Sequence, residues 1–259
     1  MVTRMMKAML LLDPEFWLIQ RWQKQSVSHF SYHLTFSCVF TRHLEQQTYP
    51  NIIADSINQP DLTDLIRQFL HEQDQPKSDS ESASSDLPEF HEKISVYSSV
   101  VATFYAPSDV SGIGGMRSER IHATNAWRNG PGRYDCIFVN TDSSVDGMLG
   151  LDVARARLFF SFKHEGIIFF CALVHWFCRV DDSPDELSGM WIVKPEFTDD
   201  GTRSASVINL DAIFRAAHLM PVFGNDAVPR YLSFTQTLDA FNSYYVNKYI
   251  DHHAFEIVF

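Results

Sequence analysis

The stretch Leu158-Phe-Phe-Ser-Phe-Lys-His-Glu-Gly-Ile-Ile-Phe-Phe-Cys-Ala-Leu-Val-His-Trp-Phe177 is rich in phenylalanine and is interrupted near its middle by Lys163-His-Glu-Gly166. Aromatic and β-branched residues favour strands, and a short polar segment that contains glycine favours a turn. The stretch therefore predicts a hairpin of two long strands. The interruption also keeps each half well short of the ~18 apolar residues that a membrane-spanning helix needs.

Further strands are expected on both sides of this hairpin. The segments with β-branched or aromatic character are residues 94–105, 134–139, 190–193 and 206–210. Residues 210–217 fit a short helix or a turn, and residues 238–250 are expected to form a C-terminal helix. The sequence thus predicts the α+β class, with a mostly β, barrel-like domain over residues 93–259 that ends in a helix.

The part of the chain before residue 72 differs in character. Pro60 is followed by Asp61-Leu-Thr-Asp-Leu-Ile-Arg-Gln-Phe-Leu70, in which apolar residues recur at helical spacing. Asp13 and Pro14 have the residue types of a helix N-cap and first turn, which indicates an earlier helix. We therefore expect a short helical N-terminal segment over residues 1–71.

Residues 72–92 are acidic, rich in serine and nearly free of apolar side chains. Such a segment cannot bury enough apolar surface to offset the entropy lost on ordering. It is predicted to be a disordered linker between the helical segment and the β domain.

The composition limits the classes of function. Of the 259 residues, 45% are hydrophobic, which is enough for a core, and the formal net charge is −11. Bulk charge therefore disfavours nonspecific nucleic-acid binding, and DNA binding would need a local basic patch. The cysteines Cys38, Cys136, Cys171 and Cys178 form no CxxC pair, which is typical of reduced thiols in an intracellular protein.

A basic stretch supplies such a patch. Its residues are Arg117, Arg120, Arg128 and Arg133, with Trp127 among them. Arginine and an aromatic ring together can hold backbone phosphate and stack on bases, so these five residues are the candidate DNA-binding residues. The alternative is a solvated loop with ordinary ion pairs.

A second candidate surface combines aromatic and acidic residues around a turn. It comprises Trp176, Phe177, Asp181, Asp182 and Trp191. Aromatic rings that face carboxylates can hold a lysine or methyl-lysine side chain by cation–π contact, so this is the candidate peptide-binding site. The alternative is a charged loop between core strands.

The sequence offers little for catalysis. Asp135, Asp142, Asp146 and Asp152 could be carboxylates of a two-metal nuclease, but they lie in expected turns. No nucleophile elbow or HExxH motif is present, the glycine-rich residues 111–117 match no phosphate-binding pattern, and the adjacent His252 and His253 seldom ligate one metal. We expect no catalytic residues, no metal site and no cofactor.

Several long blocks resemble one protein family. They are Thr103-Phe-Tyr-Ala-Pro-Ser-Asp-Val-Ser-Gly-Ile-Gly-Gly-Met-Arg117, Tyr134-Asp-Cys-Ile-Phe-Val-Asn-Thr-Asp142, Gly189-Met-Trp-Ile-Val-Lys-Pro195, Asp211-Ala-Ile-Phe-Arg-Ala-Ala-His-Leu219 and Tyr245-Val-Asn-Lys-Tyr-Ile-Asp-His-His-Ala254. They are similar to the C-terminal region of Plavaka-type transposon proteins of basidiomycete fungi, whose nuclease domain lies upstream. The resemblance implies a non-catalytic accessory region of a transposase-related nuclear protein, which contacts DNA, nucleosomes or the nuclease portion of a related protein.

A weaker resemblance concerns the fold. The succession of residues 156–162, 171–180, 206–213 and 219–223 is similar to the small β-barrel of bromo-adjacent homology domains of chromatin proteins, which by itself implies no function. Two rival functions stay open at this point. One is a metal-dependent nuclease that uses Asp135, Asp142 or Asp152, and the other is a purely structural module without a ligand.

Overall fold

The predicted hairpin is the centre of the fold. In the computed structural model, β8 (Leu151–His164) pairs with β9 (Ile167–Arg179) in antiparallel register. The turn residues Glu165 and Gly166 both have positive φ, 49° and 87°, the geometry that two-residue hairpin turns need. The prediction of two strands and a turn is confirmed, and both strands are longer than predicted.

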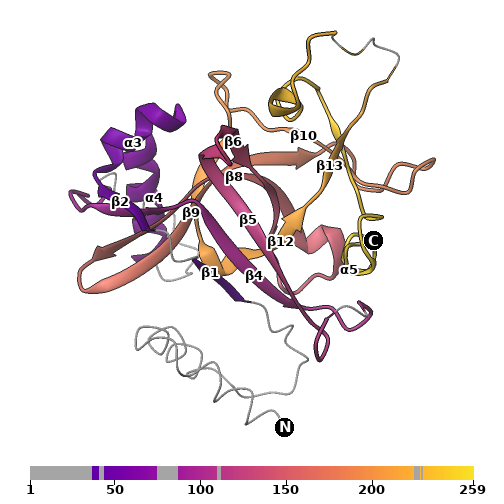
Figure 1. The fold of residues 1–259 in the computed structure, drawn as a ribbon, viewed down its shortest axis with the longest axis horizontal. Helices are drawn as coiled ribbons and strands as arrows, with labels where there is room; N and C mark the ends of the chain where they lie inside the picture. The colour runs from indigo at the N-terminus through magenta and orange to yellow at the C-terminus, as the bar shows by residue number, and fades with distance from the viewer. Residues whose placement is uncertain (1–36, 41–43, 75–86, 110–111, 225–227, 229) are drawn as a thin grey trace, which may run out of the picture. The chain divides into compact units, whose positions relative to one another are not determined.

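The structure describes residues 37–40, 44–74, 87–109, 112–224, 228 and 230–259, all within one unit that spans residues 35–259. In this part of the chain, ten strands form one sheet with β8 and β9 at its middle (Figure 1). Its other strands are β2 (Leu44–Thr48), β3 (Ile94–Tyr97), β7 (Cys136–Asn140), β10 (Ile192–Pro195), β11 (Ala205–Asn209), β12 (Ile213–Ala217), β13 (Leu219–Pro221) and β14 (Tyr244–Val246).

A second sheet of four described strands covers one face of the first. Its order is β1 (Ser37–Phe40), β4 (Ser99–Tyr105), β5 (Met116–Trp127) and β6 (Gly130–Tyr134). The intersheet core lies between the two sheets and includes Val100, Ile121, Ala156, Phe159 and Val174. The expected strand at 94–105 is therefore two strands, β3 and β4, which belong to different sheets.

Two helices cover part of the opposite face of the ten-stranded sheet. They are α3 (Pro50–Ile57) and α4 (Leu62–Asp74), which pack side by side (Figure 1). Leu62, Ile66, Phe69 and Leu70 are buried on one side of α4, as the helical spacing predicts. We call the cluster that they form with Leu158, Phe160, Phe162, Cys171 and Leu173 the helical core.

A third cluster, the C-terminal core, lies at the other end of β8 and β9. It includes Phe138, Val153, Phe177, Trp191, Val193, Tyr244 and Val258. The C-terminal helix exists, but it is α5 (His252–Ile257) rather than residues 238–250. The expected position is wrong because Tyr244 and Val246 pair with β10 and β13 as strand β14, and because the side chain of Asp251 caps a later helix.

Three short 3-10 turns complete the described elements: η2 (Gly147–Gly150), η3 (Leu210–Ala212) and η4 (Phe234–Gln236). Residues 210–217, which were expected to form a short helix or a turn, form the short turn η3 and then strand β12. No helix among the described residues is long and apolar enough to cross a membrane.

The α+β class is confirmed, but the barrel is not. Both described sheets are open, since neither strand order returns to its first strand. The expected helical character of residues 1–71 holds for α3 and α4, whereas β1 and β2 are strands; the expected helix near Asp13 and Pro14 lies outside the described residues.

The expected linker at 72–92 is described only at its two ends. Helix α4 continues to Asp74, and residues 75–86 lie outside the described part of the chain. After them, Arg67 donates hydrogen bonds to the carbonyl oxygens of Pro88 (2.9 Å) and Leu87 (3.1 Å), and Phe90 is buried in the helical core. Leu87, Pro88 and Phe90 are therefore held against the helices, whereas Glu89 and His91 are exposed. The division into domains at this segment stays a prediction.

Candidate functional site

The predicted DNA-binding residues gather at the β5–β6 hairpin, residues 116–134, which we call the Trp127 hairpin. Its turn is formed by Arg128 and Asn129, whose φ angles of 51° and 61° are typical of a type I′ turn. Trp127 pairs with Gly130 across this turn. The turn thus places the exposed side chain of Arg128 directly beside the half-buried indole of Trp127.

The indole of Trp127 has three polar neighbours. The guanidinium of Arg128 lies 5.3 Å from the ring centroid, that of Arg133 lies 5.5 Å from it, and the ring of His122 lies 4.1 Å away in an edge contact. Arginine over an aromatic face is a favourable cation–π arrangement. This part of the hairpin therefore combines an aromatic plane with two positive charges.

His122 and Asp135 hold the base of the hairpin. His122 is only 4% exposed, its Nδ1 lies 3.1 Å from Asp135 Oδ2, and Arg133 Nε donates to Asp135 Oδ1 over 2.8 Å. Burial lowers the pKa of His122, although the carboxylate of Asp135 acts against this. Asp135 therefore orients Arg133, whereas Arg128 forms no ion pair with any carboxylate in the described part of the chain.

The four predicted arginines do not share one surface. Alternate residues of a strand point to opposite faces, and Arg117 and Arg120 are three residues apart on β5. Arg120 donates to Ser99 Oγ over 3.2 Å and lies on the face of His122, whereas Arg117 forms an ion pair with Asp109. The structure therefore places Arg128 and Arg133 beside Trp127 and Arg120 near His122, and it separates Arg117 from them.

The predicted peptide-binding residues are brought together only in part. Phe177 and Trp191 are each 3% exposed and belong to the C-terminal core, and Asp181 lies in an exposed turn. Trp176 is half-buried and donates from Nε1 to Ser206 Oγ over 2.7 Å. A cavity of about 620 Å³ is lined by Trp176, Phe177 and Asp182, together with Asp152, Arg179 and Glu196.

The candidate metal-binding carboxylates have separate partners. Asp142 accepts hydrogen bonds from the backbone and hydroxyl of Ser144, and Asp152 accepts one from Thr141. Asp135 is engaged in the Trp127 hairpin, and Asp146 precedes η2. In the described ranges, no group of three or more His, Cys, Asp or Glu side chains is placed to hold a metal ion.

A row of polar residues that sequence reasoning missed crosses the ten-stranded sheet. Arg155 on β8 pairs with His175 on β9. On one side of this pair, Val153 and Phe177 pair with each other and belong to the C-terminal core. On the other side, Leu158 and Leu173 pair with each other and belong to the helical core. The polar row therefore separates two hydrophobic cores on one face of the sheet.

Two further arginines join this row. The β8–β9 register shifts between Ala156 and Leu158, so Arg157 is the extra residue of a β-bulge, a feature that often redirects a side chain. The guanidinium of Arg157 lies 4.1 Å from the ring centroid of Tyr134. The guanidinium of Arg155 lies 5.7 Å from the same ring centroid. Arg203, just before β11, lies 5.0 Å from the ring centroid of Phe177.

We call Arg155, Arg157, His175 and Arg203 the polar belt. Arg155 Nη1 donates to both carboxylate oxygens of Asp239, over 2.8 and 3.0 Å, and Arg157 Nη2 donates to the carbonyl of Ile57 at the end of α3. Burial, and then the nearby arginines, lower the pKa of His175 to about 3, so this ring is neutral and adds no positive charge.

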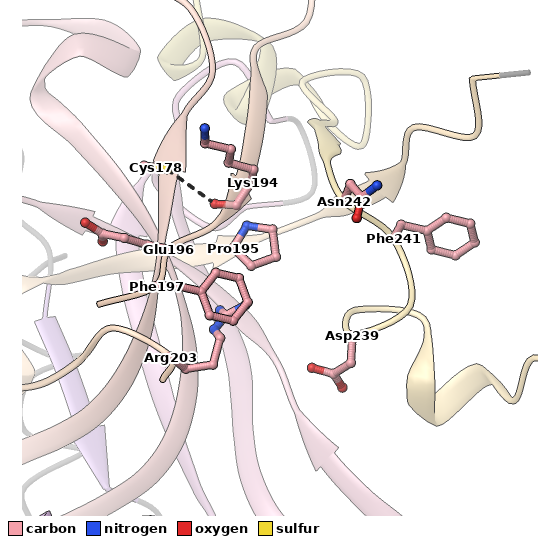
Figure 2. Close-up of a pocket in the computed structure, with 9 residues that line it drawn as sticks. All are labelled: Cys178, Lys194, Pro195, Glu196, Phe197, Arg203, Asp239, Phe241 and Asn242. Carbon is pink, nitrogen blue, oxygen red and sulfur yellow. Dashed lines mark hydrogen bonds between the residues drawn. The ribbon is translucent and has the colours of Figure 1, made fainter. Parts of the chain in front are cut away.

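A cavity opens beside the polar belt, and Figure 2 shows the side chains around it. Its volume is about 770 Å³, and its lining includes Arg203, Phe197, Lys194, Glu196, Asp239 and Phe241. In Figure 2 the carboxylate of Asp239 lies across the cavity from Arg203. Of the belt, Arg203 lines this cavity, and so does Asp239, the carboxylate that accepts hydrogen bonds from Arg155.

A sequence signal for the belt does exist. Ala154-Arg-Ala-Arg157 puts two arginines inside a strand whose other residues are apolar, directly before the phenylalanine-rich stretch. Charged residues at inward-facing strand positions are costly unless they have partners or a role.

Comparisons with protein-family models, with curated proteins and with solved structures found no match to this chain.

Proposed function

We propose that this chain is a non-catalytic binding module that contacts nucleic acid through the Trp127 hairpin. The observation that carries the proposal is the arrangement of Arg128 and Arg133 over the indole of Trp127 at a hairpin turn. A base can stack on an aromatic plane while neighbouring arginines contact its phosphates. Arg120 adds a third positive charge on the strand face of Arg133, which pairs with Thr124.

The charge of the whole chain shapes the expected binding. With a net charge of −11, the protein repels a polyanion everywhere except at a local basic surface. Binding should therefore be confined to the hairpin, be weak at physiological salt and fall steeply as salt increases. Because stacking needs an accessible base face, we expect single-stranded DNA to bind more tightly than a duplex.

The family resemblance agrees with this proposal. An accessory region of a Plavaka-type transposon protein would meet DNA, nucleosomes or the nuclease portion of a related protein in the nucleus. These partners and this location are part of the proposal, and they rest on the sequence blocks alone.

The experiment is a fluorescence anisotropy titration of labelled 20-nucleotide single strands and matched duplexes at two salt concentrations. Trp127→Ala should weaken single-strand binding by about 1–3 kcal/mol, the contribution of one stacked base. Arg128→Gln should lower the slope of log affinity against log salt by about 1. The matched control is Arg230→Gln, which removes an exposed arginine far from the hairpin in sequence.

Two outcomes would overturn the proposal. One is wild-type protein that binds neither DNA at low salt. The other is an equal loss for Arg230→Gln and Arg128→Gln, because bulk charge would then account for the binding. In the first case the purely structural module becomes the leading function.

We propose capture of a lysine side chain as the second candidate function, and the cavity beside Trp176 favours it. Its carboxylates, Asp152, Asp182 and Glu196, outnumber its one arginine, Arg179. A cation could sit between the Trp176 ring and these acids. Calorimetry with a lysine-containing peptide and its alanine analogue tests this: Asp182→Asn should weaken only the lysine peptide, and equal binding of both peptides would exclude the idea.

A further inference from the structure

We propose that Arg155, Arg157 and Arg203 form an anion-binding site, which takes the phosphate group of a small molecule from the adjacent cavity in exchange for the carboxylate of Asp239. This site is independent of the Trp127 hairpin and of nucleic-acid binding.

The charges of the polar belt are not balanced. Three guanidinium groups face one carboxylate, that of Asp239, because His175 is neutral. The charge of Asp239 also acts on Arg157 and on Arg203. Two positive charges therefore remain in a partly buried position, in a chain that is strongly acidic overall. A dianionic ligand would neutralise them.

The same arginines have unused hydrogen-bond donors. The Nε atoms of Arg155, Arg157 and Arg203 are buried and have no acceptor within the described part of the chain. Arg155 is only 8% exposed, so its guanidinium is held inside the protein rather than in solvent. Buried donors without acceptors are unfavourable, and a phosphate group offers three acceptor oxygens to such donors.

Asp239 is placed as a replaceable partner. Its side chain is 62% exposed, whereas that of its partner Arg155 is 10% exposed. The carboxylate thus reaches in from the surface and leaves its other side open to solvent. An incoming phosphate can take the same Nη1 donor of Arg155 once the exposed carboxylate turns outward.

The cavity has the size for a small phosphorylated molecule. Its volume of about 770 Å³ falls within the ~300–1,000 Å³ of ordinary ligand pockets. Arg203 and Lys194 are its basic side chains, and Asp239 and Glu196 are its acidic ones. Phe197 and Phe241 offer apolar surface for the rest of a ligand (Figure 2). The phosphate would lie against Arg203, and the organic part would lie along the two phenylalanine rings.

The experiment measures thermal unfolding and calorimetric binding of the full chain with inorganic phosphate, glycerol phosphate and succinate, each against chloride at equal ionic strength. We expect both phosphates to raise the unfolding temperature and succinate to do so less, because only phosphate has three equivalent acceptor oxygens. Glycerol phosphate should bind at least as tightly as inorganic phosphate if the cavity holds its organic part.

Two variants give opposite results if the site exists. Asp239→Asn removes the competing charge, so it should lower stability without phosphate and tighten phosphate binding at least fivefold. Arg203→Met keeps the apolar length of the side chain and should weaken binding at least fivefold. Trp127→Ala is the matched control and should leave the phosphate response unchanged, which separates this site from the proposed function.

The proposal is overturned if phosphate and chloride act equally on the wild type, or if Asp239→Asn fails to bind phosphate more tightly. If Arg203→Met does not fold, the gain expected for Asp239→Asn still decides the question. A phosphate response that is lost in Trp127→Ala would assign the anion to the hairpin instead and would also overturn the proposal.

Discussion

Arg215 and Asp251 form a two-point ion pair that ties strand β12 to the start of the C-terminal helix. Arg215 Nη1 and Nη2 donate to the two carboxylate oxygens of Asp251 over 3.0 and 2.6 Å. The same carboxylate accepts the backbone N–H of Ala254 over 2.7 Å and so caps α5. Arg215 is buried and also lies 4.7 Å from the ring centroid of Phe104.

We expect Asp251→Asn to destabilise the fold by about 2 kcal/mol, because Arg215 loses a charged hydrogen-bond partner, while Glu119 Oε2 still lies 3.5 Å from its Nη2. Asparagine still caps a helix well, so the loss reports the ion pair rather than the cap. Urea unfolding followed by circular dichroism measures it. Asp181→Asn, in an exposed turn, is the control and should change stability by less than about 0.5 kcal/mol. Equal small effects for both variants would mean that the pair is not stabilising.

The free energy of unfolding should decrease as the pH falls from about 6.5 to about 4. Burial, followed by the charge of Arg215, lowers the pKa of His253 from 6.5 to about 4. Over this range the unfolded chain binds a proton that the native chain does not, so acid favours unfolding. Urea midpoints at several pH values measure the slope.

His253→Asn should make this pH dependence shallower, since asparagine keeps a polar atom near the position of Nδ1 but takes up no proton. His252→Asn is the matched control, because the neighbouring ring is exposed. A slope that is the same in both variants would contradict the role assigned to His253.

At still lower pH, protonation of Asp251 should further lower the free energy of unfolding. Burial alone would raise the pKa of Asp251, but the hydrogen bonds from Arg215 hold that pKa at about 2.

Two neighbouring glycines allow backbone strain to be separated from steric overlap. Gly114 and Gly115 both have positive φ, 63° and 77°. A Cβ atom on Gly115 would lie 2.7 Å from Cε2 of Tyr105, whereas a Cβ atom on Gly114 would meet open space. Gly114→Ala should therefore cost about 1 kcal/mol, and Gly115→Ala should cost clearly more. Thermal unfolding measures both effects. Adding Tyr105→Leu to Gly115→Ala removes the ring that the new Cβ atom would meet, so the double variant should regain part of the stability that Gly115→Ala loses beyond Gly114→Ala.

One thiol should react much faster than the others. Cys38, Cys136 and Cys171 are buried, and burial raises the pKa of each thiol, that of Cys136 to about 12. Cys178 is half-buried and lines the cavity beside the polar belt. A thiol reagent followed by mass spectrometry should label Cys178 first in native protein, and Cys178→Ser should remove the fast phase. Fast labelling of two or more thiols would mean that a core opens readily.

The parts of the fold that the sequence predicted are those set by local patterns. The β8–β9 hairpin and helix α4 depend on apolar spacing and on a glycine turn, which a short window contains. Strands β5 and β6 were missed because most of their outward-facing residues are polar and because their turn begins with Arg128, which is not a residue that usually signals a hairpin turn. The open sheets could not be foreseen, because strand order depends on contacts distant in the sequence.

The candidate sites also differ in whether their residues are close together in the sequence. Arg128, Arg133 and Trp127 lie close together in the chain, and a single hairpin suffices to gather them. The polar belt joins Arg155, Arg203 and Asp239 from three separate segments, so a local pattern could mark Arg155 but not the residues that it meets. Trp191 shows the opposite error, since an aromatic residue beside an acidic turn was expected at the surface and is buried in the C-terminal core.

The polar belt also has a consequence for motion. Among the described residues, the helical core and the C-terminal core are separate clusters that lie on either side of Arg155 and His175 on this face of the sheet. Segments joined by few buried apolar contacts open with less free energy than the whole molecule. Amide hydrogens of α3 and α4 should therefore exchange with solvent in one cooperative event and those of β14 and α5 in another. Those at the centre of β8 and β9, which belong to all three cores, should exchange only when the entire chain unfolds.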